Sequence, residues 1–305
     1  MGLLAADTVG HLQHVSTMTL GIGGAESNVA IALARLGTSV AWIGRLGADS
    51  LGDRVVRELR AEGVEVHAVR DPAAPTGLML KERPPGGGVR VWYYRSQGAG
   101  ARLSPSDVDD ELVARASLLH VTGITPALGE APAKAVAHAV AVARDAGVPV
   151  SVDVNHRATL WSDAEAAPVL RGLVESADVL FAGDDEARLV LGTDATEPAT
   201  LAAGLADLGP GEVVVKLGDR GALALVGGLL VEQAAFPVTL VDPVGAGDAF
   251  VGAYLAERVA GLDVPGRLRT AARAGALMCT VPGDWEALPT RALLDSDRMG
   301  PDVRR

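Results

Sequence analysis

A glycine-rich turn in front of a helix is the part of this sequence that most clearly indicates chemistry. The segment 242–254 reads DPVGAGDAFVGAY, and a helix of small residues is expected to begin near Asp248. Gly245, Ala246 and Gly247 are placed to direct main-chain N–H groups at one point, where the helix adds its positive dipole end. Such a site suits a phosphate, or the charge of a phosphoryl group during transfer.

The carboxylate of Asp248 lies at the same point. In the first turn of a helix the dipole favours the ionised form, so this carboxylate can take a proton from a hydroxyl group that attacks phosphorus. The alternative is an aspartate that only caps the helix after a glycine turn. The complete string of residues favours the catalytic interpretation.

A second glycine motif precedes a helix near the start of the chain. Gly21–Gly37 reads GIGGAESNVAIALARLG, with Asn28 one turn into the helix among alanines. The spacing is not G-x-G-x-x-G, and no acidic residue closes a following strand, so a dinucleotide site is disfavoured. We expect the helix to belong to the core, with Gly24 and Asn28 at the edge of a ligand site.

The elements that must position these motifs alternate between strand and helix. Continuous apolar runs are followed by segments with helical spacing, which is typical of a parallel sheet covered on both faces. The fold class expected is therefore α/β, with a doubly wound and mostly parallel sheet. The main strand-like runs are 38–44, 118–123, 148–155, 178–183 and 212–218.

One stretch breaks the alternation. Segments 64–70, 76–82 and 89–95 are strand-like with no helix between them, and PPGGG at 84–88 predicts the turn of a hairpin. We interpret this stretch as a small β-sheet lid over an α/β body, because lids exclude water from group transfer. The alternative is an antiparallel extension without such a role. A single domain is expected, with the lid formed by about 10–22 and 64–102.

Composition excludes several classes of protein. The chain has 305 residues, a net charge of −11, 49% hydrophobic residues and 37 glycines. A chain with this many apolar residues is not expected to be disordered. No cluster of basic residues indicates a nucleic-acid partner. No apolar run is long enough to span a membrane. The single Cys279 permits no internal disulfide, and the start lacks the charge of a signal peptide. We expect a cytoplasmic protein with small-molecule ligands and neither nucleic-acid nor membrane partners.

The two glycine motifs, in this order and at opposite ends of the chain, resemble those of the ribokinase-like (PfkB) sugar kinases. The family's glycine-pair motif matches 23–37, and its D-T-x-G-A-G-D signature matches 242–248 with Pro243 in place of threonine. The resemblance implies ATP-dependent phosphorylation of a sugar hydroxyl, a ribokinase-like fold and a lid that often dimerises. It implies that Asp248 is the base and that Gly245–Gly247 form the anion hole.

Within that family the chain looks most like the 2-keto-3-deoxygluconate kinases. The segments GGAESNVA (23–30), VWYYRS (91–96), DVNHRATLW (153–161) and GDWEALP (283–289) carry this closer match. Two arginines then suit the acid group of the substrate, because they clamp a carboxylate with forked hydrogen bonds. Taken alone, Arg95 is better explained as a solvated lid residue and Arg157 as a surface residue in an ion pair. The residues that the resemblance implies for the sugar-acid site are Gly24, Tyr94, Arg95, Arg157, Asp248 and Asp284.

The resemblance also implies a nucleotide site. VVVKLGDRGA (213–222) matches the family's strand and turn beside ATP, which gives roles to Lys216, Gly218 and Gly221 in addition to Gly247. Lys216 is otherwise an ordinary lysine at the end of a strand. The family's N-x-x-E motif is reduced to Glu186, which implies an indirect contact with Mg²⁺. Mg²⁺ would be held mostly by ATP phosphates and water, and a monovalent cation is a further possible cofactor.

The start of the chain departs from the family, whose members usually open with a strand before the part that matches Met1. A further strand before Met1 is therefore expected. The alternatives to a 2-keto-3-deoxygluconate kinase are another kinase of the family, for fructose, ribose or 5-keto-2-deoxygluconate. An alternative of another class is a catalytically dead protein that binds sugar or nucleotide, and a dinucleotide-dependent oxidoreductase is a distant third.

Overall fold

The computed structural model describes residues 1–296. Its strands are β1 (Gly2–Ala6), β2 (Met18–Ile22), β3 (Ala41–Gly47), β4 (Glu65–Asp71), β5 (Leu78–Glu82), β6 (Arg90–Tyr94), β7 (Leu119–Thr122), β8 (Val150–Asp153), β9 (Val179–Gly183), β10 (Glu212–Lys216), β11 (Ala222–Val226) and β12 (Leu229–Gln233). Its helices are α1 (Ala25–Arg35), α2 (Ser50–Ala61), α3 (Asp110–Ala114), α4 (Ile124–Ala127), α5 (Glu130–Asp145), α6 (Asp163–Glu175), α7 (Asp184–Leu191), α8 (Pro198–Ala206), α9 (Ala246–Val259), α10 (Val264–Met278) and α11 (Arg291–Asp295).

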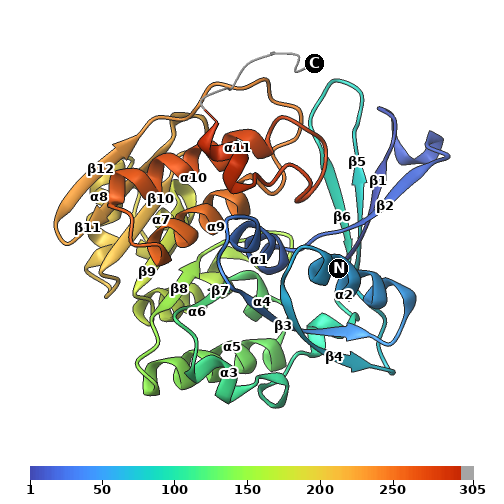
Figure 1. Ribbon diagram of the computed structural model, residues 1–305, viewed down its shortest axis with the longest axis horizontal. Helices are drawn as coiled ribbons and strands as arrows, with labels where there is room; N and C mark the ends of the chain where they lie inside the picture. Colours follow the sequence, from blue (N-terminus) through green and yellow to red (C-terminus); the bar gives the residue numbers. More distant parts are fainter. Residues whose placement is uncertain (297–305) are drawn as a thin grey trace.

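A six-stranded sheet forms the centre of the body, in the order β12-β11-β10-β9-β8-β7 (Figure 1). Strands β7, β8, β9 and β10 are parallel, and β11 and β12 continue the sheet in antiparallel pairing. The parallel strands alternate with helices in the chain, as the apolar runs of the sequence predict. The expected α/β fold with a mostly parallel sheet is confirmed.

Apolar side chains cover both faces of this sheet. Because successive residues of a strand point to opposite faces, Val213 and Val215 of β10 join one core cluster and Val214 joins the other. All three have no exposed surface. The first cluster contains residues of α5, α6, α7 and α8, and the second contains residues of α1, α9 and α10. Helix α9, which carries Asp248, is thereby fixed on a rigid support.

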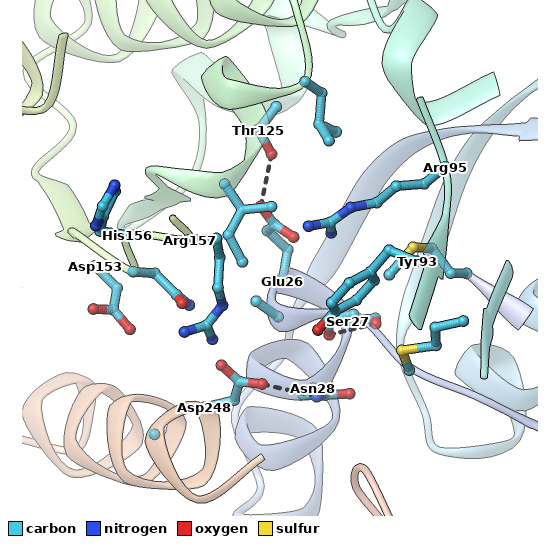
Figure 2. Close-up of a pocket in the computed structure, with 18 of the residues that line it drawn as sticks. Glu26, Ser27, Asn28, Tyr93, Arg95, Thr125, Asp153, His156, Arg157 and Asp248 are labelled. Atoms are coloured by element: carbon cyan, nitrogen blue, oxygen red, sulfur yellow. Dashed lines mark hydrogen bonds between the residues drawn. The ribbon is translucent and has the colours of Figure 1, made fainter. Parts of the chain in front are cut away.

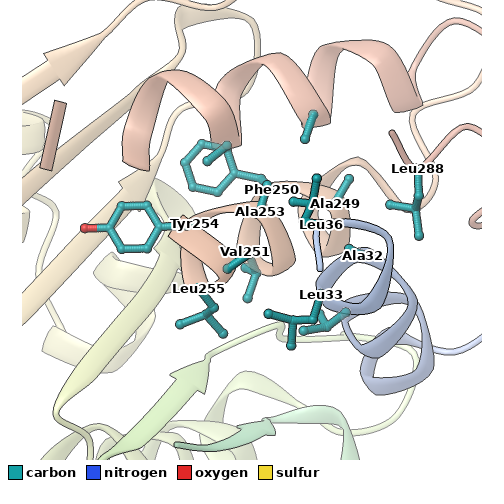
Figure 3. Packing of buried hydrophobic residues seen from close by; sticks show 14 of the residues in the cluster. Ala32, Leu33, Leu36, Ala249, Phe250, Val251, Ala253, Tyr254, Leu255 and Leu288 are labelled. Carbon is teal, nitrogen blue, oxygen red and sulfur yellow. The ribbon is translucent and has the colours of Figure 1, made fainter. Parts of the chain in front are cut away.

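Helix α9 packs between α1 and α10 (Figure 3). Its small residues permit close contact, since a Cβ added at Gly252 would lie only 2.5 Å from the Cβ of Ala32 in α1. Phe250, Tyr254 and Leu255 fill the surrounding core. This packing aligns the first turns of α1 and α9, which carry the two glycine motifs of the sequence.

The lid is a four-stranded sheet in the order β2-β1-β5-β6 that projects from one side of the body (Figure 1). The predicted hairpin is present, because β5 and β6 are antiparallel and the 84–88 turn joins them. The boundaries differ from those expected. Strand β1 belongs to the lid, whereas β4 pairs in parallel with β3 in a separate two-stranded sheet. The reason is that α2 connects β3 to β4 as a β-α-β unit. The expected strand before Met1 stays a prediction.

Candidate active site

A cleft of about 1000 Å³ lies between the lid and the body. Its walls come from the inner face of the lid, the first turns of α1 and α9, and the ends of β8, β9 and β10. The carboxyl ends of parallel strands and helix N-termini meet there, which is where α/β folds usually bind ligands. Figure 2 shows the side chains that converge on this cleft.

The turn before α9 has the geometry of an anion site. Gly245 has a φ of +80°, and a Cβ at this position would lie 2.2 Å from the carbonyl oxygen of Asp284. Only glycine fits there without strain. The N–H groups of Gly245, Gly247 and Asp248 have no main-chain acceptor among the described residues. Ala246 differs from the expectation, since its N–H bonds to the carbonyl of Pro243 at 3.2 Å and it does not line the cleft.

Asp248 lies in the first turn of α9, only 8% exposed, and lines the cleft. Burial raises its pKa to about 7, and the carboxylates of Asp284 and Asp153 add to the rise. The hydrogen bond from Asn28 and the charge of Arg157 act in the opposite direction. A carboxylate with a pKa near neutrality is well matched to general-base chemistry at physiological pH.

Asn28 holds two carboxylates together. Its Nδ2 donates to Asp248 at 2.8 Å and to Asp284 at 3.0 Å, while the main-chain N–H of Gly24 donates to Asp284 at 3.2 Å. Burial raises the pKa of Asp284 as well. The Oδ1 of Asn28 is buried and has no partner in the described part of the chain. That oxygen is a free acceptor for a ligand hydroxyl group.

Two arginines enter the cleft from opposite sides. Arg95 extends from the end of β6, with its guanidinium 4.3 Å from the ring centre of Tyr93, and Arg157 extends from the loop after β8 towards Asp248 (Figure 2). No hydrogen bond joins either guanidinium to another residue drawn in that figure. The Nε of Arg95 is buried without a partner in residues 1–296. The pair therefore presents unused donors for an anionic group.

Tyr94 lies elsewhere than expected. It is 62% exposed and does not line the cleft, whereas Tyr93 does. The physical reason is the two-residue period of β6, which turns Trp92 and Tyr94 to the outer face of the lid and Tyr93 to the inner face. Tyr93 thus forms part of the lid wall of the cleft, together with Met79 of β5.

Lys216 ends β10, and Glu186 lies in the first turn of α7. The ammonium of Lys216 is 2.6 Å from Asp153 Oδ1. Burial opposes its charge, but Asp153 and Glu186 outweigh that effect and raise its pKa. Glu186 accepts hydrogen bonds from the N–H groups of Gly183 (2.6 Å) and His156 (2.8 Å). Both residues line the cleft.

The two glycines after β10 differ in position. Gly218 lines the cleft with a φ of +61°, but Gly221 does not line it. A Cβ at Gly221 would lie 2.0 Å from the carbonyl oxygen of Gln233, so this glycine permits the close pairing of β11 and β12. Residues 1–296 contain no group of three or more His, Cys, Asp or Glu that could hold a metal ion.

Tyr93, Asp153 and Glu26 are among the cleft residues that were not predicted as site residues. Because neighbouring side chains of a strand point to opposite faces, the strand expected at 89–95 already placed Tyr93 on the face opposite to Tyr94. Asp153 begins the DVNHRATLW segment at the end of an apolar strand, and its burial (2% exposed) next to Lys216 follows only from the sheet order. Glu26 accepts from the hydroxyls of Thr122 and Thr125, both at 2.7 Å, which are about a hundred residues away in the sequence.

Comparison with known proteins decides the family. The model of the "pfkB family carbohydrate kinase" matches residues 3–291. The chain belongs to this family. The enzyme is therefore a phosphotransferase with an alcohol group as acceptor, as the two glycine motifs predicted. Among the described residues, no helix combines the length and the apolar character that crossing a membrane requires.

Several characterised kinases are similar over most of their length. The chain is 40% identical over 267 residues to the 2-dehydro-3-deoxygalactonokinase of Haloferax volcanii, covering 86% of this kinase and 82% of that protein. It is 36% identical to the 2-dehydro-3-deoxygluconokinase of Bacillus subtilis, and the match covers 97% of this chain and 92% of that protein. The structure of a putative ribokinase II of E. coli in complex with ATP and Mg²⁺ is similar, with a TM-score of 0.87 and 26% identity. The match covers 96% of this chain and 94% of that chain.

Proposed function

We propose that this kinase transfers the γ-phosphoryl group of ATP to the primary hydroxyl of 2-keto-3-deoxygluconate (2-dehydro-3-deoxygluconate). The observation that carries the proposal is the position of Arg95 and Arg157. Both guanidinium groups enter the cleft that holds Asp248, and no hydrogen bond joins either of them to the carboxylates of Glu26 and Asp248 drawn nearby (Figure 2). A neutral sugar leaves these donors unpaired, whereas the carboxylate of a sugar acid satisfies them.

The reaction follows from the groups around Asp248. The carboxylate takes the proton of the substrate hydroxyl, whose oxygen forms a bond to the γ-phosphorus as the bond between that phosphorus and the bridging oxygen of ADP breaks. The N–H groups of Gly245, Gly247 and Asp248 stabilise the charge on the transferring group. The Oδ1 of Asn28 accepts from a sugar hydroxyl and helps to orient the substrate.

The nucleotide is proposed to lie at the ends of β9 and β10, beside Lys216 and Gly218. The donors there fit phosphates, since the ammonium of Lys216 and the first turn of α9 face the same cleft. Mg²⁺, when bound with ATP, neutralises phosphate charge. Its ligands in this proposal are mostly nucleotide oxygens, because the described residues lack a cluster of metal-binding side chains. The proposal places the reaction in the cytoplasm.

Turnover with defined acceptors tests the proposed substrate. ATP consumption is measured with 2-keto-3-deoxygluconate, its C4 epimer 2-keto-3-deoxygalactonate, fructose and ribose. We expect kcat/KM to be highest for 2-keto-3-deoxygluconate and lowest for the two neutral sugars. Faster turnover of fructose or ribose would replace the proposal by the alternative of a neutral-sugar kinase. Ligand binding without any turnover would favour a catalytically dead binding protein.

We further propose that the kinase forms a homo-oligomer through the lid. The outer face of the lid exposes Leu20 (37%), Trp92 (46%) and Tyr94 (62%), on strands that are otherwise paired. Aromatic and aliphatic groups that cluster on an exposed sheet face are typical of protein contacts. Light scattering during gel filtration tests this, with Trp92→Asp expected to shift the protein to a smaller species.

A further inference from the structure

One of the chain's three lysines is buried between the lid and the loop that precedes α9. Lys81 extends from β5, and its side chain is only 4% exposed. By the two-residue period of the strand it shares the inner face of the lid with Met79, which lines the cleft. Lys81 itself is not among the lining residues, so it acts on the site through its neighbours.

The ammonium of Lys81 is held by oxygens of the body. It lies 2.8 Å from Asp242 Oδ2, and it donates to the carbonyl oxygen of Gly283. The Asp242 side chain is 2% exposed, so the ion pair is almost fully removed from water. A lysine is not left in such a place without a partner, and a carboxylate with a carbonyl satisfies two of its three donors.

Asp242 connects this ammonium to the anion site. Its Oδ1 accepts from the N–H of Val244 at 3.0 Å, and its Oδ2 accepts from the N–H of Gly283 at 3.3 Å. Val244 directly precedes Gly245, whose left-handed conformation starts α9. The ammonium of Lys81 therefore holds Asp242, which in turn fixes the turn whose N–H groups point into the cleft. It also neutralises the Asp242 carboxylate, three residues before Gly245.

We propose that Lys81 is a built-in cation that positions the anion-binding loop, so that this kinase requires no free monovalent cation. A carboxylate and a main-chain carbonyl are ligands that K⁺ or NH₄⁺ also accepts, but here the ammonium of Lys81 already occupies them. The monovalent cation considered from the sequence thus does not fit this loop. The inference rests on the proposed kinase function, and it makes Lys81 a positioning residue rather than a catalytic one.

Cation dependence tests the proposal. The kinase and its Lys81→Ala variant are assayed with 2-keto-3-deoxygluconate and ATP in tetramethylammonium, K⁺ or NH₄⁺ chloride at equal ionic strength. We expect the rate of the unmodified kinase to be the same in all three salts. The variant should lose about 10- to 100-fold in kcat in the tetramethylammonium salt. K⁺ or NH₄⁺ should restore most of that loss, because a small cation enters the vacated space.

The control is Lys134→Ala. Lys134 is 66% exposed on α5, where it pairs with Glu130 on the same helix, so its removal should leave the rate and its indifference to the cation unchanged. Activation of the unmodified kinase by K⁺ would overturn the proposal even if no Lys81 variant folded. A folded Lys81→Ala or Lys81→Met variant that K⁺ and NH₄⁺ fail to rescue would also overturn it.

Thermal unfolding separates this proposal from the proposed substrate. If no sugar acid is turned over, the substrate assignment fails while the cation site remains testable. The Lys81→Ala variant should then gain melting temperature in K⁺ or NH₄⁺ relative to tetramethylammonium, and the unmodified protein should not. Equal shifts for the two proteins would contradict the role of Lys81.

Discussion

The side-chain amide of Asn28 donates a 2.8 Å hydrogen bond to the carboxylate of Asp248, across 220 residues of sequence. The bond joins the first turns of α1 and α9, the two elements that carry the glycine motifs (Figure 2). It fixes the direction of the carboxylate whose pKa burial raises to about 7. The predictions below concern this carboxylate and the groups that surround it.

Replacing Asp248 with asparagine should lower kcat by about 10²- to 10⁴-fold, because general-base catalysis contributes that much to proton transfer. In the unmodified kinase kcat/KM should rise with pH through an apparent pKa near 7, as Asp248 becomes ionised. The pH profile of both proteins is the measurement. Near-normal turnover by the variant would remove Asp248 as the base.

The same substitution should make stability less dependent on pH. Since burial raises the pKa of Asp248 in the folded state, the folded protein binds a proton between about pH 4 and 7 that the unfolded chain has released. Stability of the unmodified kinase therefore falls as pH rises through this range, by at most about 4 kcal/mol from this group. Urea unfolding of both proteins is measured at pH 5 and pH 8. The free energy of unfolding of the Asp248→Asn variant, relative to that of the unmodified kinase, should be higher at pH 8 than at pH 5. If the two proteins differed in unfolding free energy by the same amount at pH 5 and pH 8, the raised pKa of Asp248 would be contradicted.

Tyr93 and Tyr94 offer a matched pair of variants. Tyr93→Ala removes the ring beneath the Arg95 guanidinium and should raise KM for the sugar acid about 3- to 30-fold, the range for a cation–π contact. Tyr94→Ala removes an exposed side chain on the outer face of the lid and should leave KM unchanged. Steady-state kinetics compare them, and a larger effect at Tyr94 would contradict the inner position of Tyr93.

Arg157→Gln should raise KM for 2-keto-3-deoxygluconate by about 10- to 100-fold, as expected for losing a hydrogen bond between charged groups. The effect on a neutral acceptor such as fructose should be much smaller. Arg171→Gln is the control, because Arg171 is exposed on α6 and pairs with Glu175 of the same helix. An unchanged KM for the sugar acid in the Arg157 variant would exclude this residue from carboxylate binding.

Gly245→Ala should destabilise the kinase by at least about 2 kcal/mol, since it adds strain at a positive φ and brings a Cβ against the Asp284 carbonyl. Activity should fall with it, because the turn carries the free N–H groups. Gly211→Ala is the matched control, because a Cβ there meets nothing within 4 Å. Urea unfolding and kcat measure both, and equal effects would mean that the Gly245 turn has no special geometry.

Local patterns in the sequence were sufficient for much of the body. The alternation of apolar runs with helical segments predicted the α/β sheet, and glycine, proline and polar residues marked the hairpin turn of the lid. The extent of the lid was not predictable in the same way. Strand β1 pairs with β5, more than seventy residues later, and β4 follows α2 into a different sheet. Pairing partners at such separations depend on the whole chain.

For the active site, the sequence by itself determined which residue types are present and the order of the two glycine motifs. Asp248, Gly245 and Asn28 were identifiable because a glycine turn before a helix has the same local geometry wherever it occurs. Only the tertiary structure decided that Tyr93 rather than Tyr94 lines the cleft, that Ala246 has no free N–H, and that Lys81 pairs with Asp242. These facts depend on strand register and on contacts between distant elements, which burial and packing of the complete fold select.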